Sequence, residues 1–295
     1  MQRSTIGLMV TLAVGLLLTP LTTDAQQPAK VPLIGTLGDG SPPSEAQRQQ
    51  SPFLQKLHEL GWCEGHNITF ERRGAEGKLD RLPDLAAELV RLRPDIIVTG
   101  GTLGVRAAQQ TTTTIPIVVA GAGMLVEQGI VASLAHPGGN ITGVENTPLG
   151  LSGKRLALLK EAVPQLARVA FLFNPVNPFF TRELPSVETD ARALGLQLQS
   201  VAVRHADEFD AAFATIVEHR PDALFIADDG LLVLHRRQIM DFATTHRLPT
   251  VGGERQFATA GSLMAFGWSR REIGQRAAVY VDKILKGARP GDLPI

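Results

Sequence analysis

Small and hydrogen-bonding residues follow the apolar, β-branched runs in the first half of this chain. A glycine at such a place lets a ligand approach the backbone, and free N–H groups at the start of a helix favour a carboxylate or a phosphate. These loops therefore predict a binding surface that offers mainly N–H and hydroxyl donors. The residues expected to form it are Gly38, Asp39, Ser41, Gly101, Thr102, Ala122 and Gly123.

The corresponding loops in the second half of the chain add amides and carboxylates, at Asn174, Asn177, Asp228 and Asp229. In an open α/β sheet, ligands bind beyond the carboxyl ends of the strands, where loops meet helix N-termini. A donor-rich half and an acceptor-rich half would together suit an amphoteric solute such as an amino acid. We expect Asn174, Asn177 and Asp228 to contact the same ligand as the first set.

Each of these loops also has a purely structural interpretation. The run from Gly100 to Thr102 could cap the helix that follows, and one aspartate of the Asp228–Asp229 pair could be an N-cap. The Asn-Pro-Val-Asn-Pro run that starts at Asn174 could be a rigid turn. The occurrence of such loops at corresponding strand ends favours a binding site over any one of these alternatives.

Motifs for catalysis, metal binding and cofactor binding are missing from the sequence. The seven histidines show no His-x-x-x-His or Cys-paired spacing. Residues 150–153 miss the nucleophile elbow by one position, and no dinucleotide fingerprint follows the first strand. We therefore expect no catalytic residue, no metal and no cofactor. The alternative is an exported two-lobed enzyme, such as a nucleotide-sugar transferase, in which Asp228 and Asp229 would be metal or base residues.

The elements that position these loops alternate between short β-branched runs and longer amphipathic runs, which is typical of parallel sheets covered by helices. The same three residues precede a strand–helix–strand unit in each half, at Arg93-Pro94-Asp95 and at Arg220-Pro221-Asp222. The two halves therefore have a similar sequence pattern. The pattern predicts an α/β fold with two doubly wound parallel-sheet lobes. Strands are expected at 31–37, 67–72, 95–99, 116–120, 141–144, 168–173, 196–203, 223–227 and 249–251.

The order of these elements predicts how the chain divides into domains. We expect residues 31–145 plus 262–288 in the first lobe, and residues 146–261 plus 289–295 in the second. The helix from Arg270 to Lys286 comes too late to extend the second unit, so the chain is expected to cross back to the first lobe after Ser262.

The first residues and the overall charge bear on the compartment and on possible partners. A basic start, an apolar run from Ile6 to Leu18 and small residues up to Ala25 predict a signal peptide over 1–25. Lysine plus arginine equals aspartate plus glutamate, 29 against 29, so no electrostatic footprint for nucleic acid exists. The one cysteine, Cys63, excludes an internal disulfide.

Several stretches resemble one known family, the ABC-transporter substrate-binding proteins related to the tryptophan/tyrosine-binding type, which have a type I periplasmic-binding fold. The matching stretches are LGWCEGHNI at 60–68, DRLPDLAAELV at 80–90, IPIV at 115–118, LAHPGGNITG at 134–143, SGKRL at 152–156 and VDKILKGA at 281–288.

The resemblance implies an extracytoplasmic, periplasmic receptor that closes two lobes on a small molecule and delivers it to membrane permease subunits. It implies hinge segments near Glu145 and Asn146, at 262–267 and near the C-terminus, and it adds Phe266 to the expected ligand contacts. We expect a monomer that binds no nucleic acid. Members of the family usually continue past the segment matching 292–295, so the second lobe is expected to be C-terminally short.

Overall fold

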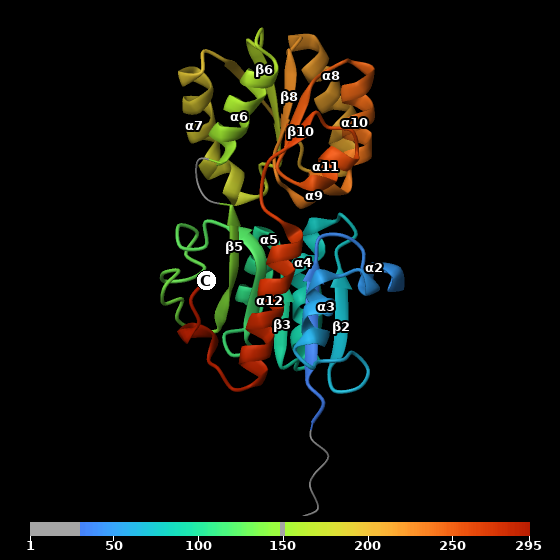
Figure 1. Cartoon of the computed structure of the whole chain (residues 1–295), viewed down its shortest axis with the longest axis vertical. Coiled ribbons are helices and arrows are strands. Elements are labelled where there is room, and N and C mark those ends of the chain that lie inside the picture. Colours follow the sequence, from blue (N-terminus) through green and yellow to red (C-terminus); the bar gives the residue numbers. More distant parts are fainter. Residues whose placement is uncertain (1–29, 148–150) are drawn as a thin grey trace, which may run out of the picture. The chain divides into compact units, whose positions relative to one another are not determined.

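Five parallel strands in the order β2-β1-β3-β4-β5 form the first sheet of the computed structural model, which describes residues 30–147 and 151–295 (Figure 1). Each strand follows an apolar, β-branched run of the sequence. Their bounds are β1 Leu33–Gly38, β2 Thr69–Gly74, β3 Ile96–Thr99, β4 Ile117–Gly123 and β5 Ile141–Thr147.

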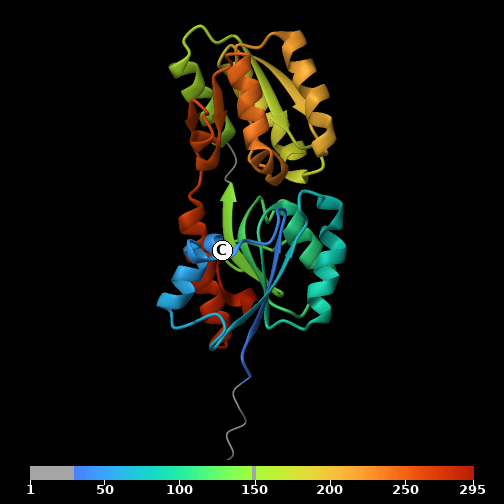
Figure 2. The same cartoon turned by 90° about the vertical axis from the view of Figure 1, so that its right-hand side faces the viewer.

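Helices cover both faces of this sheet. Figure 2 shows α3 and α12 on one side of the sheet and α4 and α5 on the other. The helices of this part are α2 Glu45–Gln49, α3 Pro52–Glu59, α4 Leu82–Arg91, α5 Thr102–Thr111 and α12 Arg270–Leu285, with a 3₁₀ turn at Leu79–Arg81.

The alternation of side chains along β3 explains why helices can cover both faces. Ile96 and Val98 belong to the apolar cluster that includes Val281 of α12, whereas Ile97 belongs to the cluster that includes Val105 of α5. Successive side chains of a strand point to opposite faces, so an uninterrupted apolar run is what a sheet buried on both sides requires.

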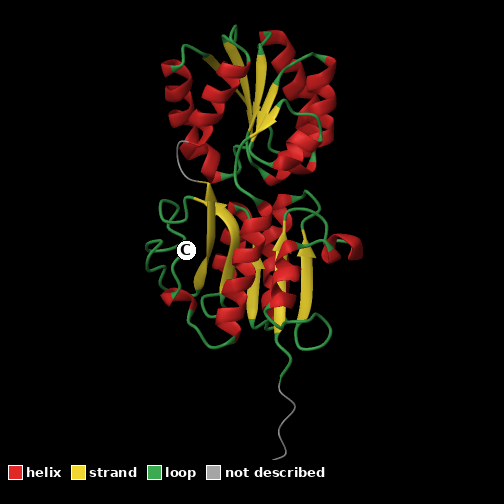
Figure 3. Ribbon diagram, in the orientation of Figure 1, coloured by secondary structure: helices red, strands yellow, loops and turns green. Residues whose placement is uncertain are grey.

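The second sheet also has five parallel strands, in the order β10-β9-β8-β6-β7 (Figure 3). Their bounds are β6 Arg168–Phe173, β7 Gln197–Ala202, β8 Ala223–Ile226, β9 Thr250–Gly252 and β10 Met264–Ala265. The helices of this part are α6 Leu151–Ala162, α7 Pro178–Ala193, α8 Phe209–His219, α9 Gly230–Leu234, α10 Arg236–Thr245 and α11 Arg255–Thr259, with a 3₁₀ turn at Ala206–Glu208. A further 3₁₀ turn, Pro290–Asp292, packs on β5 of the first sheet.

The predicted fold class is confirmed, because each set of five parallel strands has flanking helices and the order within each sheet is that of a doubly wound fold. We call the first sheet with its helices the first lobe, and the second sheet with its helices the second lobe. Residues Pro32–Ile295 form one compact unit.

Two details of the predicted domain bounds are wrong. β10 pairs with β9, so residues 264–265 belong to the second sheet and the chain leaves that sheet only after them. The last residues lie against the first lobe, because Thr142 donates a hydrogen bond to the Leu293 carbonyl and Ile295 N–H donates to the Leu134 carbonyl. A two-residue strand and an irregular tail carry no periodicity from which their partners could be read.

The predicted signal peptide at 1–25 lies outside the described residues. Within the part of the chain that the structure does describe, no helix combines the length and the apolar character needed to cross a bilayer.

Candidate functional site

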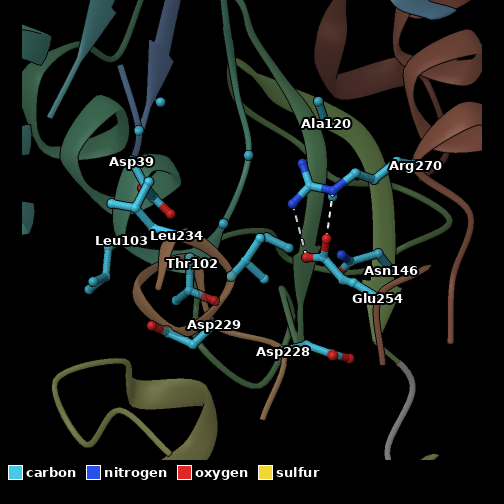
Figure 4. A pocket seen from close by; sticks show the side chains of 18 of the residues that line it. Asp39, Thr102, Leu103, Ala120, Asn146, Asp228, Asp229, Leu234, Glu254 and Arg270 are labelled. Atoms are coloured by element: carbon cyan, nitrogen blue, oxygen red, sulfur yellow. Dashed lines mark hydrogen bonds and ion pairs between the residues drawn. The ribbon is translucent and has the colours of Figure 1, made fainter. Parts of the chain in front are cut away.

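A cavity of about 710 Å³ is lined by loops that follow the strands of both lobes (Figure 4). Nine of the eleven residues that the sequence predicted as ligand contacts line it. They are Gly38, Asp39, Ser41, Gly101, Thr102, Ala122, Gly123, Asn177 and Asp228. Within each lobe their grouping follows from topology, since the carboxyl ends of parallel strands lie at one edge of a sheet. Contact with a ligand stays a prediction for each of them.

The other two predicted residues, Asn174 and Phe266, are not part of the cavity lining. Asn174 is fully buried and donates a hydrogen bond to Asp229 at 3.1 Å. The Phe266 carbonyl accepts from Arg155, and its ring lies 4.9 Å from the Lys154 ammonium. In this structure both residues support the wall, and a role as direct contacts stays a prediction.

The N-terminus of α5 presents backbone donors to the cavity. Gly101, the N-cap, has a φ of +71°, which glycine adopts without strain, and no side chain caps the helix. The Gly101 N–H itself is committed to the Gly121 carbonyl at 2.7 Å. The N–H groups of the first helical turn, at Thr102 and Leu103, have no intrahelical acceptor by helix geometry, so they are the donors that an anionic group could use.

Asp229 is the structural cap that the sequence left open as an alternative. It is the N-cap of α9, where Oδ1 accepts from Leu231 N–H at 3.0 Å. Its two oxygens also accept from the side-chain amides of Asn174 and Asn177. Burial raises the pKa of Asp229, and the hydrogen bonds from Asn177, Asn174 and Leu231 oppose that rise.

Asp39, in the first lobe, faces Asp229, but it has fewer hydrogen-bond donors around it. Its Oδ1 is buried and accepts no hydrogen bond. The pKa of Asp39 is raised from 3.8 to about 7, because burial and then the charge of Asp229 raise it more than the charge of Arg270 lowers it. Asp39 is thus a carboxylate whose ionisation a nearby charge on a bound solute would change.

This raised pKa has a consequence for stability. Between about pH 4 and pH 7 the folded protein holds a proton on Asp39 that the unfolded chain has lost, so this group makes stability fall as the pH rises through that range. We expect Asp39→Asn to remove this dependence. Without ligand, we compare the melting temperatures of the variant and the wild type. The melting temperature of the variant minus that of the wild type should increase by a few degrees from about pH 5 to pH 8.

Thermal melts of both proteins across that range are the measurement. Asp80→Asn, which removes an exposed carboxylate of the same lobe, is the control and should leave the pH profile unchanged. A parallel profile for Asp39→Asn and the wild type would contradict the prediction.

Asp228 is held by a buried ion pair. Arg155 Nη2 donates to Asp228 Oδ2 at 2.5 Å, and the two side chains are 2% and 4% exposed. Arg155 Nε also donates to the Phe266 carbonyl at 2.6 Å. Burial raises the pKa of Asp228, and the Arg155 charge opposes that rise. The second oxygen, Oδ1, is buried without a hydrogen-bond partner, and Asp228 itself lines the cavity.

Arg270 and Glu254 form a two-pronged ion pair at the opposite part of the wall (Figure 4). Arg270 Nε and Nη2 donate to the two oxygens of Glu254 at 2.6 and 2.9 Å. Burial raises the pKa of Glu254 and Arg270 opposes the rise. The pair joins the start of α12, which packs on the first sheet, to the loop after β9 in the second lobe.

The described residues contain no group of three or more His, Cys, Asp and Glu side chains placed to hold a metal ion. Three carboxylates of the cavity, at Asp228, Asp229 and Glu254, instead accept hydrogen bonds from arginine, amide and backbone donors. This arrangement can orient a polar solute through hydrogen bonds and charge.

The sequence profile of the ABC transporter substrate binding protein family matches residues 43–295. The chain belongs to this family. It is a substrate-binding component of an ABC transporter that binds a small organic solute, as the sequence predicted. Substrate-binding proteins of this family bind small molecules, work with ABC permeases and are normally extracytoplasmic.

Similar proteins agree with this assignment. The chain is 24% identical over 243 residues to the tyrosine-binding protein of Clostridioides difficile strain R20291, covering 82% of this chain and 70% of that one. A conserved domain protein from Vibrio cholerae superposes with a TM-score of 0.82 at 24% identity, over 90% of this chain and 88% of that chain. An ABC domain from Streptococcus pneumonia, solved in complex with L-Trp, superposes with a TM-score of 0.81 at 20% identity, over 90% of this chain and 88% of that chain. The likeness to these solved structures confirms the type I periplasmic-binding fold.

Several cavity residues of this substrate-binding protein were missed by sequence reasoning. Trp268, Arg270 and Glu254 lie on segments that the sequence marked only as a crossing or a strand end. Trp268 Nε1 is buried without a hydrogen-bond partner, so it is a further donor in the wall. These residues lie just after β9 and β10. Because ligands bind beyond the carboxyl ends of parallel strands, this position is the signal that could have identified them.

Proposed function

We propose that this protein is a periplasmic, monomeric and non-catalytic receptor whose solute is an amino acid or a close analogue. The observation that carries the proposal is the juxtaposition of the uncapped α5 N-terminus with the carboxylates Asp39 and Asp228 in one cavity. Backbone N–H groups favour the carboxylate of such a solute, and the aspartates favour its ammonium.

The two lobes suggest how capture would work. β5 and the segment between β10 and α12 connect the lobes in the described residues, and we propose that they act as hinges at 145–147 and 266–269. A solute that contacts both lobes shifts the population toward the arrangement that recognises it, and permease subunits would then recognise that arrangement. The predicted signal peptide at 1–25 supports export, and the balanced charge supports the absence of nucleic-acid partners.

The ion pair and hydrogen bonds that hold Asp228 and Asp229 support a non-catalytic binding role. Asp228, the residue that the enzyme alternative needs as a base or a metal ligand, is paired to a buried arginine. Asp229 is occupied by three donors as a helix cap.

A thermal-shift panel tests the proposal. We expect at least one of the twenty common amino acids to raise the melting temperature of the mature protein, because a ligand at 100 times its dissociation constant adds about 2.7 kcal/mol of stability. Simple sugars and nucleotide sugars serve as the contrasting class. A folded protein that responds to sugars or nucleotide sugars, and to no amino acid, would contradict the proposal.

A further inference from the structure

Two buried carboxylate oxygens in the cavity wall have no hydrogen-bond partner. They are Oδ1 of Asp39 in the first lobe and Oδ1 of Asp228 in the second. A buried acceptor left without a donor costs about 1–3 kcal/mol, and more when it is charged. Both residues line the cavity, so a solute whose donors reach these two oxygens removes both penalties.

The charges around the cavity do not balance. Four carboxylates line it, at Asp39, Asp228, Asp229 and Glu254, and two guanidinium groups line it, at Arg236 and Arg270. Arg155, paired to Asp228 from behind the wall, makes the count three positive against four negative. With these groups ionised, the wall has a net charge of −1. A zwitterion leaves this charge uncompensated, whereas a solute of charge +1 neutralises it.

Asp39 and Asp229 are the two carboxylates of the cavity without an ion pair in the described residues. Glu254 is paired to Arg270 through two hydrogen bonds, and Asp228 is paired to Arg155. Asp39 has no ion pair in the described residues, and the charge that most opposes its ionisation is Asp229 across the cavity. A cation next to Asp39 would therefore replace a repulsion between two carboxylates with an attraction.

We infer that the solute is a monocation, a basic amino acid or a comparable amine, with one cationic group on Asp39 Oδ1 and a second donor on Asp228 Oδ1. This inference deepens the proposed function and rests on it. The side chain of lysine or arginine supplies the cation that is absent from leucine or tyrosine, and the α-ammonium supplies the second donor.

Isothermal titration with L-lysine, L-arginine, L-leucine, L-tyrosine and L-glutamate tests the inference. At about pH 8, where Asp39 is ionised, lysine or arginine should bind at least roughly tenfold more tightly than the other three. Asp39→Asn should remove that preference. Asp80→Asn is the control, since it changes the net charge equally at an exposed site of the same lobe.

A second measurement needs no variant. The groups that face Asp39 are Asp229 on α9 and Arg270 on α12, with Asp228, Glu254 and Arg236 farther along the wall, and no histidine is among the described residues that line the cavity. Protonation of Asp39 should therefore weaken lysine binding roughly tenfold or more between about pH 8 and pH 5.5, with proton release on binding at the lower pH.

The outcomes separate the inference from the proposed function. Leucine or tyrosine binding as tightly as lysine and arginine at the higher pH overturns the inference and leaves the proposed function intact. Retention of the cation preference in Asp39→Asn, or lysine affinity that does not change with pH, also overturns it. A folded protein that binds no amino acid overturns both.

Discussion

Replacing Arg155 with alanine is expected to lower the free energy of unfolding by about 3–5 kcal/mol, because it leaves a buried carboxylate without its counter-ion. Arg155 and Asp228 are 2% and 4% exposed, so water cannot take over the lost interaction in the folded state. The variant also frees the Phe266 carbonyl, which accepts from Arg155 Nε at 2.6 Å. Urea unfolding followed by circular dichroism is the measurement.

Arg168→Ala is the matched control. It removes the same side chain from an exposed pair, in which Arg168 and Asp222 are 49% and 34% exposed and 3.7 Å apart. Exposed pairs contribute about 0–1 kcal/mol, so this variant should stay close to the wild type. Adding Asp228→Asn to Arg155→Ala should restore part of the lost stability, since it removes the unpaired charge. Equal losses in the two arginine variants would show that burial of the Arg155–Asp228 pair has no special importance.

The fold and the position of the cavity were predictable because both follow from local patterns. Uninterrupted apolar runs such as Ile96–Val98 specify strands that are buried on both faces. Once such strands are parallel, the loops at their carboxyl ends must share one edge of the sheet, and this rule brings Gly38 and Gly101 to one edge of the first sheet and Asp228 to the corresponding edge of the second.

The charge pairs of the site were not predictable from local patterns. Arg155 lies on α6 and contacts Asp228, which is 73 positions away in the sequence, whereas an arginine is ordinarily exposed. Arg270 and Glu254 meet only because the chain passes through β10 and then leaves the second sheet. These contacts depend on tertiary geometry, so the sequence could supply the glycine and aspartate positions of the wall but not the arginines that balance them.

Gly230→Ala is expected to weaken binding of the amino acid that stabilises the wild type by roughly tenfold to a hundredfold, the equivalent of about 1–3 kcal/mol of steric cost. A Cβ at Gly230 would overlap the Asp39 carboxylate, since it would lie 3.0 Å from Asp39 Cγ and 3.2 Å from Asp39 Cβ. Rotating the carboxylate does not relieve the contact with Asp39 Cβ. Asp39 or the first lobe must therefore move away from Gly230. The two lobes can then no longer contact the same solute at the same time.

The fold itself should tolerate this change, because the nearest atoms to the added methyl group all belong to Asp39 and none belongs to the second lobe. The unliganded melting temperature of Gly230→Ala is thus expected to match that of the wild type, while titration calorimetry shows the loss of affinity. Gly40→Ala is the control, since Gly40 lines the same cavity but its Cβ would meet no atom within 4 Å. If both variants bind as tightly as the wild type, the approach of Asp39 to the start of α9 is not required for capture.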